Sequence, residues 1–185
     1  KRGILSRLDV RKAPMDFAIG SKVIYPSHGT AVVTGRSVRE VDGEKVTYLE
    51  LSVAAGEESW RGGALKVSVP EDRAEDLGVR PAISADEVDD VLAVLAVTNV
   101  RVPTNWSRRF KNHQEKMKSG DIYECAEVVR NLSLRERSSK LSSAEKAMLG
   151  KARHILVSEL AVSWDCSMEE AGDRIDAVLD GLAVA

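Results

Sequence analysis

The spacing of hydrophobic residues changes once along this chain, near Pro81. Before that point apolar residues come in short alternating runs such as KVTYLELSV at 45–53, which is the period of a half-buried β-strand. After it they recur every three to four residues, which is the period of an amphipathic helix. Because a sheet face and a helix stripe each need a partner to bury them, we expect an α+β protein, with strands first and a compact all-α domain second.

The residues before Pro81 predict a small β-barrel. Asp42-Gly43 supplies the positive φ that a tight hairpin requires, and 57–63 has the composition of a longer loop. Four or five short antiparallel strands in so short a segment suit an SH3-like or Tudor-like barrel. The expected strands lie at 23–25, 30–38, 45–53 and 64–70.

The residues after Pro81 contain repeated helix-start signals. In a capping box, a Ser hydroxyl accepts from the backbone three residues later, while a Glu at that position bonds back to the Ser. Pro103-Thr104 starts the helix expected at 105–119, which Gly120 ends, and Asp121 caps the helix after it. The expected capping boxes are Ser84 with Glu87, Ser142 with Glu145 and Ser167 with Glu170.

The net charge of −2 hides an uneven distribution of 27 Lys and Arg against 29 Asp and Glu. Residues 15–100 carry eight basic and 15 acidic side chains, whereas residues 101–160 carry 13 basic and seven acidic ones. An acidic front and a basic middle predict two domains with different partners. A solvated helical face is the other interpretation of the basic segment.

We expect three parts in the chain. It starts at Lys1 and a well-patterned segment begins only at Met15, so residues 1–14 are interpreted as an extension outside the fold. The barrel is assigned to 15–80, and the helical domain, with an acidic C-terminal helix, to 81–185. No stretch approaches the roughly 20 apolar residues of a membrane span, and the first residues lack the apolar core of a secretory signal, so a cytoplasmic protein is expected.

The sequence offers no constellation for catalysis or for a metal. His28, His113 and His154 are far apart, and none has a Cys, Asp or Glu at ligand spacing. Cys125 falls on an expected apolar helix stripe, where a small buried side chain is expected. We therefore expect no metal, no cofactor and no enzymatic activity.

The strongest functional signal is a tryptophan among cations at the expected start of a helix, in PTNWSRRFK at 103–111. A helix N-terminus presents free N–H groups and partial positive charge to a phosphate, and Arg108, Arg109 and Lys111 add full charges. At that place Trp106 could stack on a flipped base or act as a wedge at a disrupted base step. These residues favour a nucleic-acid contact.

The same spacing also permits a core role for the tryptophan. At about 100° per residue, Trp106, Phe110, His113 and Met117 fall within about 60° of one another, as a core-facing stripe would. From the spacing alone, the wedge and the core role both stay open.

Both parts of the chain carry distinctive blocks of sequence, namely FAIGSKVIYPSHG at 17–29, PTNWSRR at 103–109, AEVVRNL at 126–132 and LSSAEKAMLGKAR at 141–153. With these blocks the chain, from residue 15 to about residue 161, resembles the CarD/CdnL-like bacterial transcription regulators. The N-terminal module of that family is shared with transcription-repair coupling factors as an RNA polymerase-interacting domain.

The resemblance implies a Tudor-like domain that docks on the RNA polymerase β subunit, and a helical domain that meets promoter DNA at the upstream edge of the transcription bubble. In such proteins the residue that matches Trp106 is a minor-groove wedge, beside basic residues that grip phosphates. Little sequence specificity is expected from such contacts. The expected DNA-binding residues are Trp106, Arg108, Arg109, Lys111, Lys146 and Lys151.

The resemblance also implies polymerase contacts in the barrel. Arg39 aligns with a family interaction residue, and Val41 lies beside it. The chain departs from the family at Ser68, where an Arg is usual, and at the long loop 57–63. Arg61 in that loop could substitute for the missing Arg. Arg39, Val41, Ser68 and Arg61 are thus the candidate polymerase-binding residues.

Together these expectations describe a monomeric regulator, associated with the nucleoid through RNA polymerase, that stabilises the open promoter complex without chemistry on a small-molecule substrate. A protein adaptor with no direct DNA role, in which Trp106 belongs to the core, is the alternative. Whether the outcome at a given promoter is activation or repression is left open by the sequence.

Overall fold

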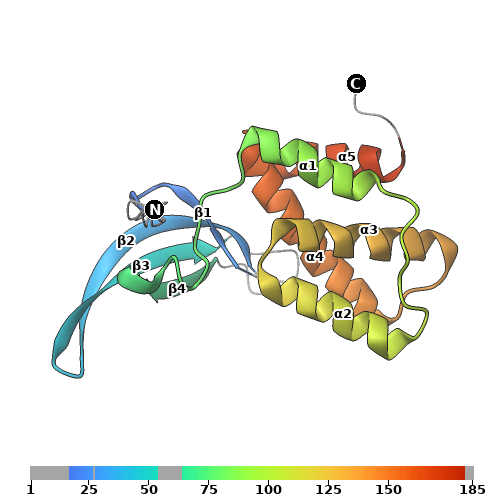
Figure 1. Ribbon diagram of the computed structural model, residues 1–185. Helices are drawn as coiled ribbons and strands as arrows, with labels where there is room; N and C mark the ends of the chain where they lie inside the picture. The colour runs from blue at the N-terminus through green and yellow to red at the C-terminus, as the bar shows by residue number, and fades with distance from the viewer. Residues whose placement is uncertain (1–16, 27, 54–63, 182–185) are drawn as a thin grey trace, which may run out of the picture.

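The computed structural model describes residues 17–181 apart from residue 27 and residues 54–63. Within them, a curled four-stranded antiparallel sheet precedes five α-helices (Figure 1), which confirms the expected α+β fold with a Tudor-like first domain. The proposed extension at 1–14 and the loop 57–63 with Arg61 lie outside the described residues. The elements are β1 (Lys22–Tyr25), β2 (Gly29–Val41), β3 (Glu44–Val53), β4 (Leu65–Pro70), η1 (Glu71–Arg73), α1 (Ala85–Ala96), α2 (Trp106–Ser119), α3 (Ile122–Ser138), α4 (Ser143–Ser163) and α5 (Met168–Leu179).

The strands follow one another in the order β1-β2-β3-β4, so that β1 and β4 form opposite edges of a half-barrel. The β2–β3 hairpin closes at Asp42-Gly43, whose φ values of 53° and 84° confirm the predicted turn. This hairpin projects away from the helices (Figure 1). One face of the sheet encloses a core of Phe17, Val23, Ala31, Val33, Leu49, Leu51, Val53, Val69, Ala74 and Val79.

A register shift in β2 between Val33 and Gly35 exchanges its two faces. Before the shift, Val33 opposes Leu51 on the core side, and after it Gly35 opposes Glu50. Residues directly opposite each other in antiparallel strands share a face. Odd-numbered residues after the shift therefore point outward with Glu50, and Ser68 of β4, which opposes Glu50, joins them on this outer face.

The predicted capping signals all begin helices. The side chains of the five N-cap residues accept from backbone N–H groups of the first turn, and the boxes at α1, α4 and α5 are complete in both directions. In Figure 1, α1 and α5 lie side by side, and α2 lies along α3. The N-cap residues are Ser84, Asn105, Asp121, Ser142 and Ser167.

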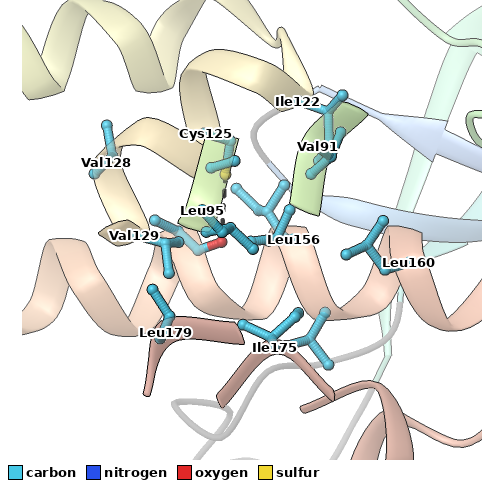
Figure 2. Packing of buried hydrophobic residues seen from close by; sticks show 14 of the residues in the cluster. Val91, Leu95, Ile122, Cys125, Val128, Val129, Leu156, Leu160, Ile175 and Leu179 are labelled. Atoms are coloured by element: carbon cyan, nitrogen blue, oxygen red, sulfur yellow. Dashed lines mark hydrogen bonds between the residues drawn. The ribbon is translucent and has the colours of Figure 1, made fainter. Parts of the chain in front are cut away.

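The helical core is formed by α1, α3, α4 and α5, whose apolar side chains meet in Figure 2. Leu132, Leu156, Leu160 and Ile175 are completely buried there. The Cys125 thiol lies 3.3 Å from the Ala152 carbonyl oxygen, and burial raises its pKa to about 12. Cys125 is therefore the buried small side chain that the sequence predicted.

The sheet and the helices are joined through the C-terminal half of α4. The backbone N–H of Thr30 donates to Ser158 Oγ at 3.2 Å, and the Thr30 hydroxyl donates to the Ser158 carbonyl at 2.8 Å. The buried Glu159 carboxylate accepts from Arg80 at 2.5 and 3.0 Å and from the Ile83 backbone at 3.2 Å. These bonds fix the two domains relative to each other.

Candidate functional site

Trp106 is the first residue of α2 and lies at the surface, with 45% of the residue exposed. Its indole Nε1 donates to Ser142 Oγ at 3.2 Å, and its ring stacks on Phe110 with the centroids 5.2 Å apart. Ser142 is the N-cap of α4, so the N-termini of α2 and α4 meet at this indole. The structure therefore does not place Trp106 in the core.

Arg109 occupies the position toward the core instead, with 1% of the residue exposed. Its Nε and Nη2 donate to Glu145 Oε1 at 2.9 and 2.8 Å. Its Nη1 donates to the carbonyl oxygens of Pro103 and Thr104 at 3.1 and 2.9 Å. The structure does not present Arg109 to a phosphate, because its guanidinium is enclosed and its Nε, Nη1 and Nη2 all donate within the protein.

The other predicted cations are exposed but do not form one cluster. Arg108 lies in the first turn of α2, and Lys111 in its second turn, 3.9 Å from Glu115. Lys146 follows one turn after the α4 N-cap, close in sequence to the indole's acceptor. Lys151 lies nine residues after that N-cap, about 13 Å along the helix axis. Arg108 and Lys146 are thus the predicted cations nearest to the two helix starts.

The meeting of two helix N-termini gives this surface an electrostatic character that the side chains reinforce. The first backbone N–H groups of a helix carry partial positive charge and suit an anionic oxygen. Lys140, which the sequence analysis did not single out, is exposed two residues before the α4 N-cap. We refer to Trp106, Arg108, Lys140 and Lys146 as the Trp106 surface.

His113 lies one turn deeper in α2 than Arg109 and has 2% of the residue exposed. Its Nδ1 is buried without a hydrogen-bond partner. Burial, followed by the positive charges of Arg109 and Lys116, lowers the pKa of His113 to about 4. The imidazole is therefore neutral at pH 7, beside a buried ion pair.

Lowering the pH from 7 to 5 is expected to destabilise the fold through His113. Its folded pKa of about 4 lies below the ordinary value of 6.5, so the unfolded chain binds a proton that the folded chain does not. This contribution is complete above about pH 6.5 and is lost as the pH falls toward 4. After allowance for solvent screening, we expect a loss of about 1–2 kcal/mol by pH 5, measured by urea unfolding.

The control for this pH dependence is His113→Gln, which cannot be protonated. Its unfolding free energy should change less between pH 7 and pH 5 than that of the wild type. The pKa of Glu145 is lowered from 4.5, so loss of its charge affects stability only below this window. An equal pH dependence in the variant and the wild type would contradict the assignment to His113.

A second cluster lies on the outer face of the sheet. Arg39 Nη2 donates to Glu50 Oε1 at 3.0 Å and to Ser68 Oγ at 2.8 Å, and its guanidinium carbon lies 4.7 Å from the centroid of the Tyr48 ring. Ser68 in turn donates to Glu50 Oε2 at 2.8 Å. Arg39 and Ser68, predicted separately, are thus brought together by one carboxylate. Val41 is 42% exposed at the end of β2.

The Glu50 carboxylate, which holds this cluster together, favours its ionised form. Hydrogen bonds from Ser37 and Ser68, helped by the charge of Arg39, lower the pKa of Glu50 against a smaller opposing effect of burial. Glu50 was not among the sequence candidates. Glu50 can be recognised as a site residue only once the β2 register shift is known, because that shift places Ser37 and Arg39 on the outer face of the sheet with it.

Among the described residues, no group of three or more His, Cys, Asp and Glu side chains is arranged to hold a metal ion. In the same part of the chain, no helix is both long and apolar enough to span a membrane. The features that stand out are therefore two separate surfaces, one on the sheet and one at the starts of α2 and α4.

Comparison with known proteins gives matches over both domains. The CarD-like/TRCF RID domain matches residues 17–83, and the CarD C-terminal domain matches residues 90–176. The chain is also 29% identical over 154 residues to the Bacillus subtilis (strain 168) protein named "Putative transcription factor YdeB", an alignment that covers 79% of this chain and 91% of that protein. The chain belongs to the CarD-like family of transcription factors, and its sheet is the family's RNA polymerase-interacting domain.

Proposed function

We propose that this protein binds the RNA polymerase β subunit through the outer face of the sheet around Arg39, and promoter DNA through the Trp106 surface. In this role it stabilises the open promoter complex as a monomer, by binding and without catalysis. The observation that carries the proposal is the exposure of Trp106, a large apolar side chain that is 45% accessible at the junction of two helix N-termini.

The DNA contact follows from what these groups can recognise. An indole can enter the minor groove and pack against a disrupted base step, which is already open at the edge of a melted bubble. Arg108, Lys140 and Lys146 then supply charge for phosphates on either side, without reading bases. The wedge binds the melted state better than the closed one, and only this difference shifts the equilibrium.

The junction between the domains makes weak DNA contacts sufficient. Docking of the sheet on polymerase raises the local concentration of the helical domain near the promoter. The bonds of Ser158 and Glu159 to the sheet side fix where the Trp106 surface is then presented. Specificity for the promoter comes from polymerase in this proposal, so the isolated protein should discriminate little between DNA sequences.

Replacing Trp106 with Ala should shorten the lifetime of the open promoter complex by roughly three- to tenfold, since tenfold corresponds to about 1.4 kcal/mol of differential affinity. The fold should persist because the side chain is half exposed and lies outside the core clusters. The measurement is the decay of open complexes formed with purified polymerase, with and without the protein, on one promoter.

The matched control is Val97→Ala, which truncates another apolar residue that is also 45% exposed, just after α1. It should leave the lifetime unchanged. If Trp106→Ala remains folded, binds polymerase and still stabilises open complexes fully, the wedge is wrong. An exposed Trp can also anchor a protein partner, so loss of polymerase binding by Trp106→Ala would favour the adaptor alternative instead.

A further inference from the structure

We propose that Glu145 is a positioning residue for Trp106, because one carboxylate fixes both the indole and the backbone that leads into it. The inference rests on the proposed role of Trp106 at DNA, and it identifies the residues that hold the indole in place before DNA binds. Glu145 itself does not reach the surface, since only 2% of the residue is exposed.

Glu145 Oε2 positions the indole through Ser142. A Ser hydroxyl has one proton to donate and two lone pairs that accept. Ser142 Oγ donates to Glu145 Oε2 at 2.9 Å, and it accepts from the Glu145 backbone N–H at 3.2 Å and from Trp106 Nε1 at 3.2 Å. An ionised carboxylate can only accept, so it takes the hydroxyl proton and leaves the remaining lone pair for the indole N–H.

Glu145 Oε1 positions the backbone before α2 through Arg109. Glu145 Oε1 accepts from Nε and Nη2 of Arg109, which leaves Nη1 to hold the carbonyl oxygens of Pro103 and Thr104. These two residues immediately precede Asn105, the N-cap of α2. The entry of the chain into the first turn of α2, where Trp106 begins, is therefore tied to the same carboxylate.

Comparison with the other capping boxes shows that capping alone does not explain why Glu145 is buried. Glu87 in α1 and Glu170 in α5 make the same reciprocal bonds with their Ser residues, and both are exposed. A cap therefore needs no buried acid in this fold. Burying an ionised acid is costly unless a cation pairs with it. Glu145 Oε1 lies 2.8 Å from Arg109 Nη2 and 3.9 Å from Arg135 Nε. The buried position is explained if the carboxylate must reach the start of α2.

Glu145 stays in the acceptor form that this arrangement needs. Burial raises its pKa, but hydrogen bonds from Ser142 and Arg109 together with the Arg109 charge outweigh burial, and the net pKa is lowered. A side chain that is already ordered before binding loses less freedom when it binds. From the usual cost of immobilising one side chain, we expect the positioning to contribute roughly two- to tenfold to the lifetime of the open complex.

The test uses pairs of variants in matching capping boxes. Ser142→Gly removes the acceptor of the indole, whereas Ser167→Gly makes the same change at α5, and a Gly N-cap costs only a few tenths of a kcal/mol relative to Ser. Glu145→Gln is paired with Glu170→Gln in the same way. In the ¹⁵N-labelled free protein, the indole N–H signal of Trp106, assigned by Trp106→Phe, reports local order and exchange with water.

We expect faster exchange and greater mobility of the Trp106 indole in Ser142→Gly and Glu145→Gln, and no change in the α5 variants. Unchanged indole dynamics in both α4 variants would overturn the inference. If Glu145→Gln proves too unstable to study, Ser142→Gly alone decides, because it keeps the buried ion pair.

Open-complex lifetimes separate this inference from the proposed function. Ser142→Gly should shorten the lifetime two- to tenfold in the wild-type background and have no further effect in the Trp106→Ala background. If Trp106→Ala shortens the lifetime but Ser142→Gly does not, the positioning role is wrong while the wedge stands. If Trp106→Ala itself has no effect, the proposed function fails, and the indole measurement still shows whether Glu145 orders Trp106.

Discussion

Replacing Arg109 with Met is expected to lower the free energy of unfolding by about 3–5 kcal/mol, a large part of the 5–15 kcal/mol that holds a typical domain folded. The substitution leaves the Glu145 carboxylate buried without its closest cation. It also removes the donor to the carbonyl oxygens of Pro103 and Thr104. Met keeps the length of the aliphatic stem, so the loss reports the charge and the hydrogen bonds rather than a cavity. Urea unfolding followed by circular dichroism measures it.

The matched control is Arg108→Met, the same change at the neighbouring exposed position of α2. Surface substitutions away from special contacts usually alter stability by less than about 0.5 kcal/mol. The double variant Arg109→Met with Glu145→Met should be more stable than Arg109→Met alone, because no charge then remains unpaired in the interior. Equal stability of Arg108→Met and Arg109→Met would contradict a structural role for the buried pair.

Local signals explain why the helices were predictable from sequence. An N-cap depends on about four consecutive residues, and each cap inferred from Ser or Asp is present in the structure. The hairpin at Asp42-Gly43 is equally local, because its positive φ values come from the two residues themselves. The observed β2 is longer than predicted and runs to Val41, since its pairing with β3 extends to the turn.

Long-range contacts explain what the sequence did not show in the candidate site. The predicted stripe of α2 contained Trp106, Phe110, His113 and Met117. Of these only His113 is buried, and the other buried residue of the helix is Arg109. Hydrophobic periodicity treats an Arg as a surface residue and cannot see Glu145, which lies 36 positions away in sequence. Similarly, the sequence analysis predicted only a missing polymerase contact at Ser68, whereas in the structure Ser68 joins Arg39 to Glu50.

Replacing Gly29 with Ala is expected to lower the free energy of unfolding by about 2–4 kcal/mol, through the junction between the two domains. Gly29 has a φ of +83°, which an L-residue with a side chain adopts only with strain. An added Cβ would also lie 2.5 Å from Ser158 Oγ and 3.5 Å from the Ile155 Cα. Ser158 cannot move away freely, because its hydroxyl and carbonyl hold Thr30.

The control for this prediction is Gly43→Ala, at the tip of the β2–β3 hairpin. Gly43 has a φ of +84° and nothing within 4 Å of an added Cβ, so this variant should lose only the conformational part, about 1 kcal/mol. The difference between the two variants in urea unfolding therefore measures how tightly β2 packs on α4. Equal losses would mean that the junction yields to an extra methyl group. In the function proposed above, docking of the sheet on polymerase would then not determine where Trp106 meets DNA, and any gain from joining the two surfaces would have to come from tethering alone.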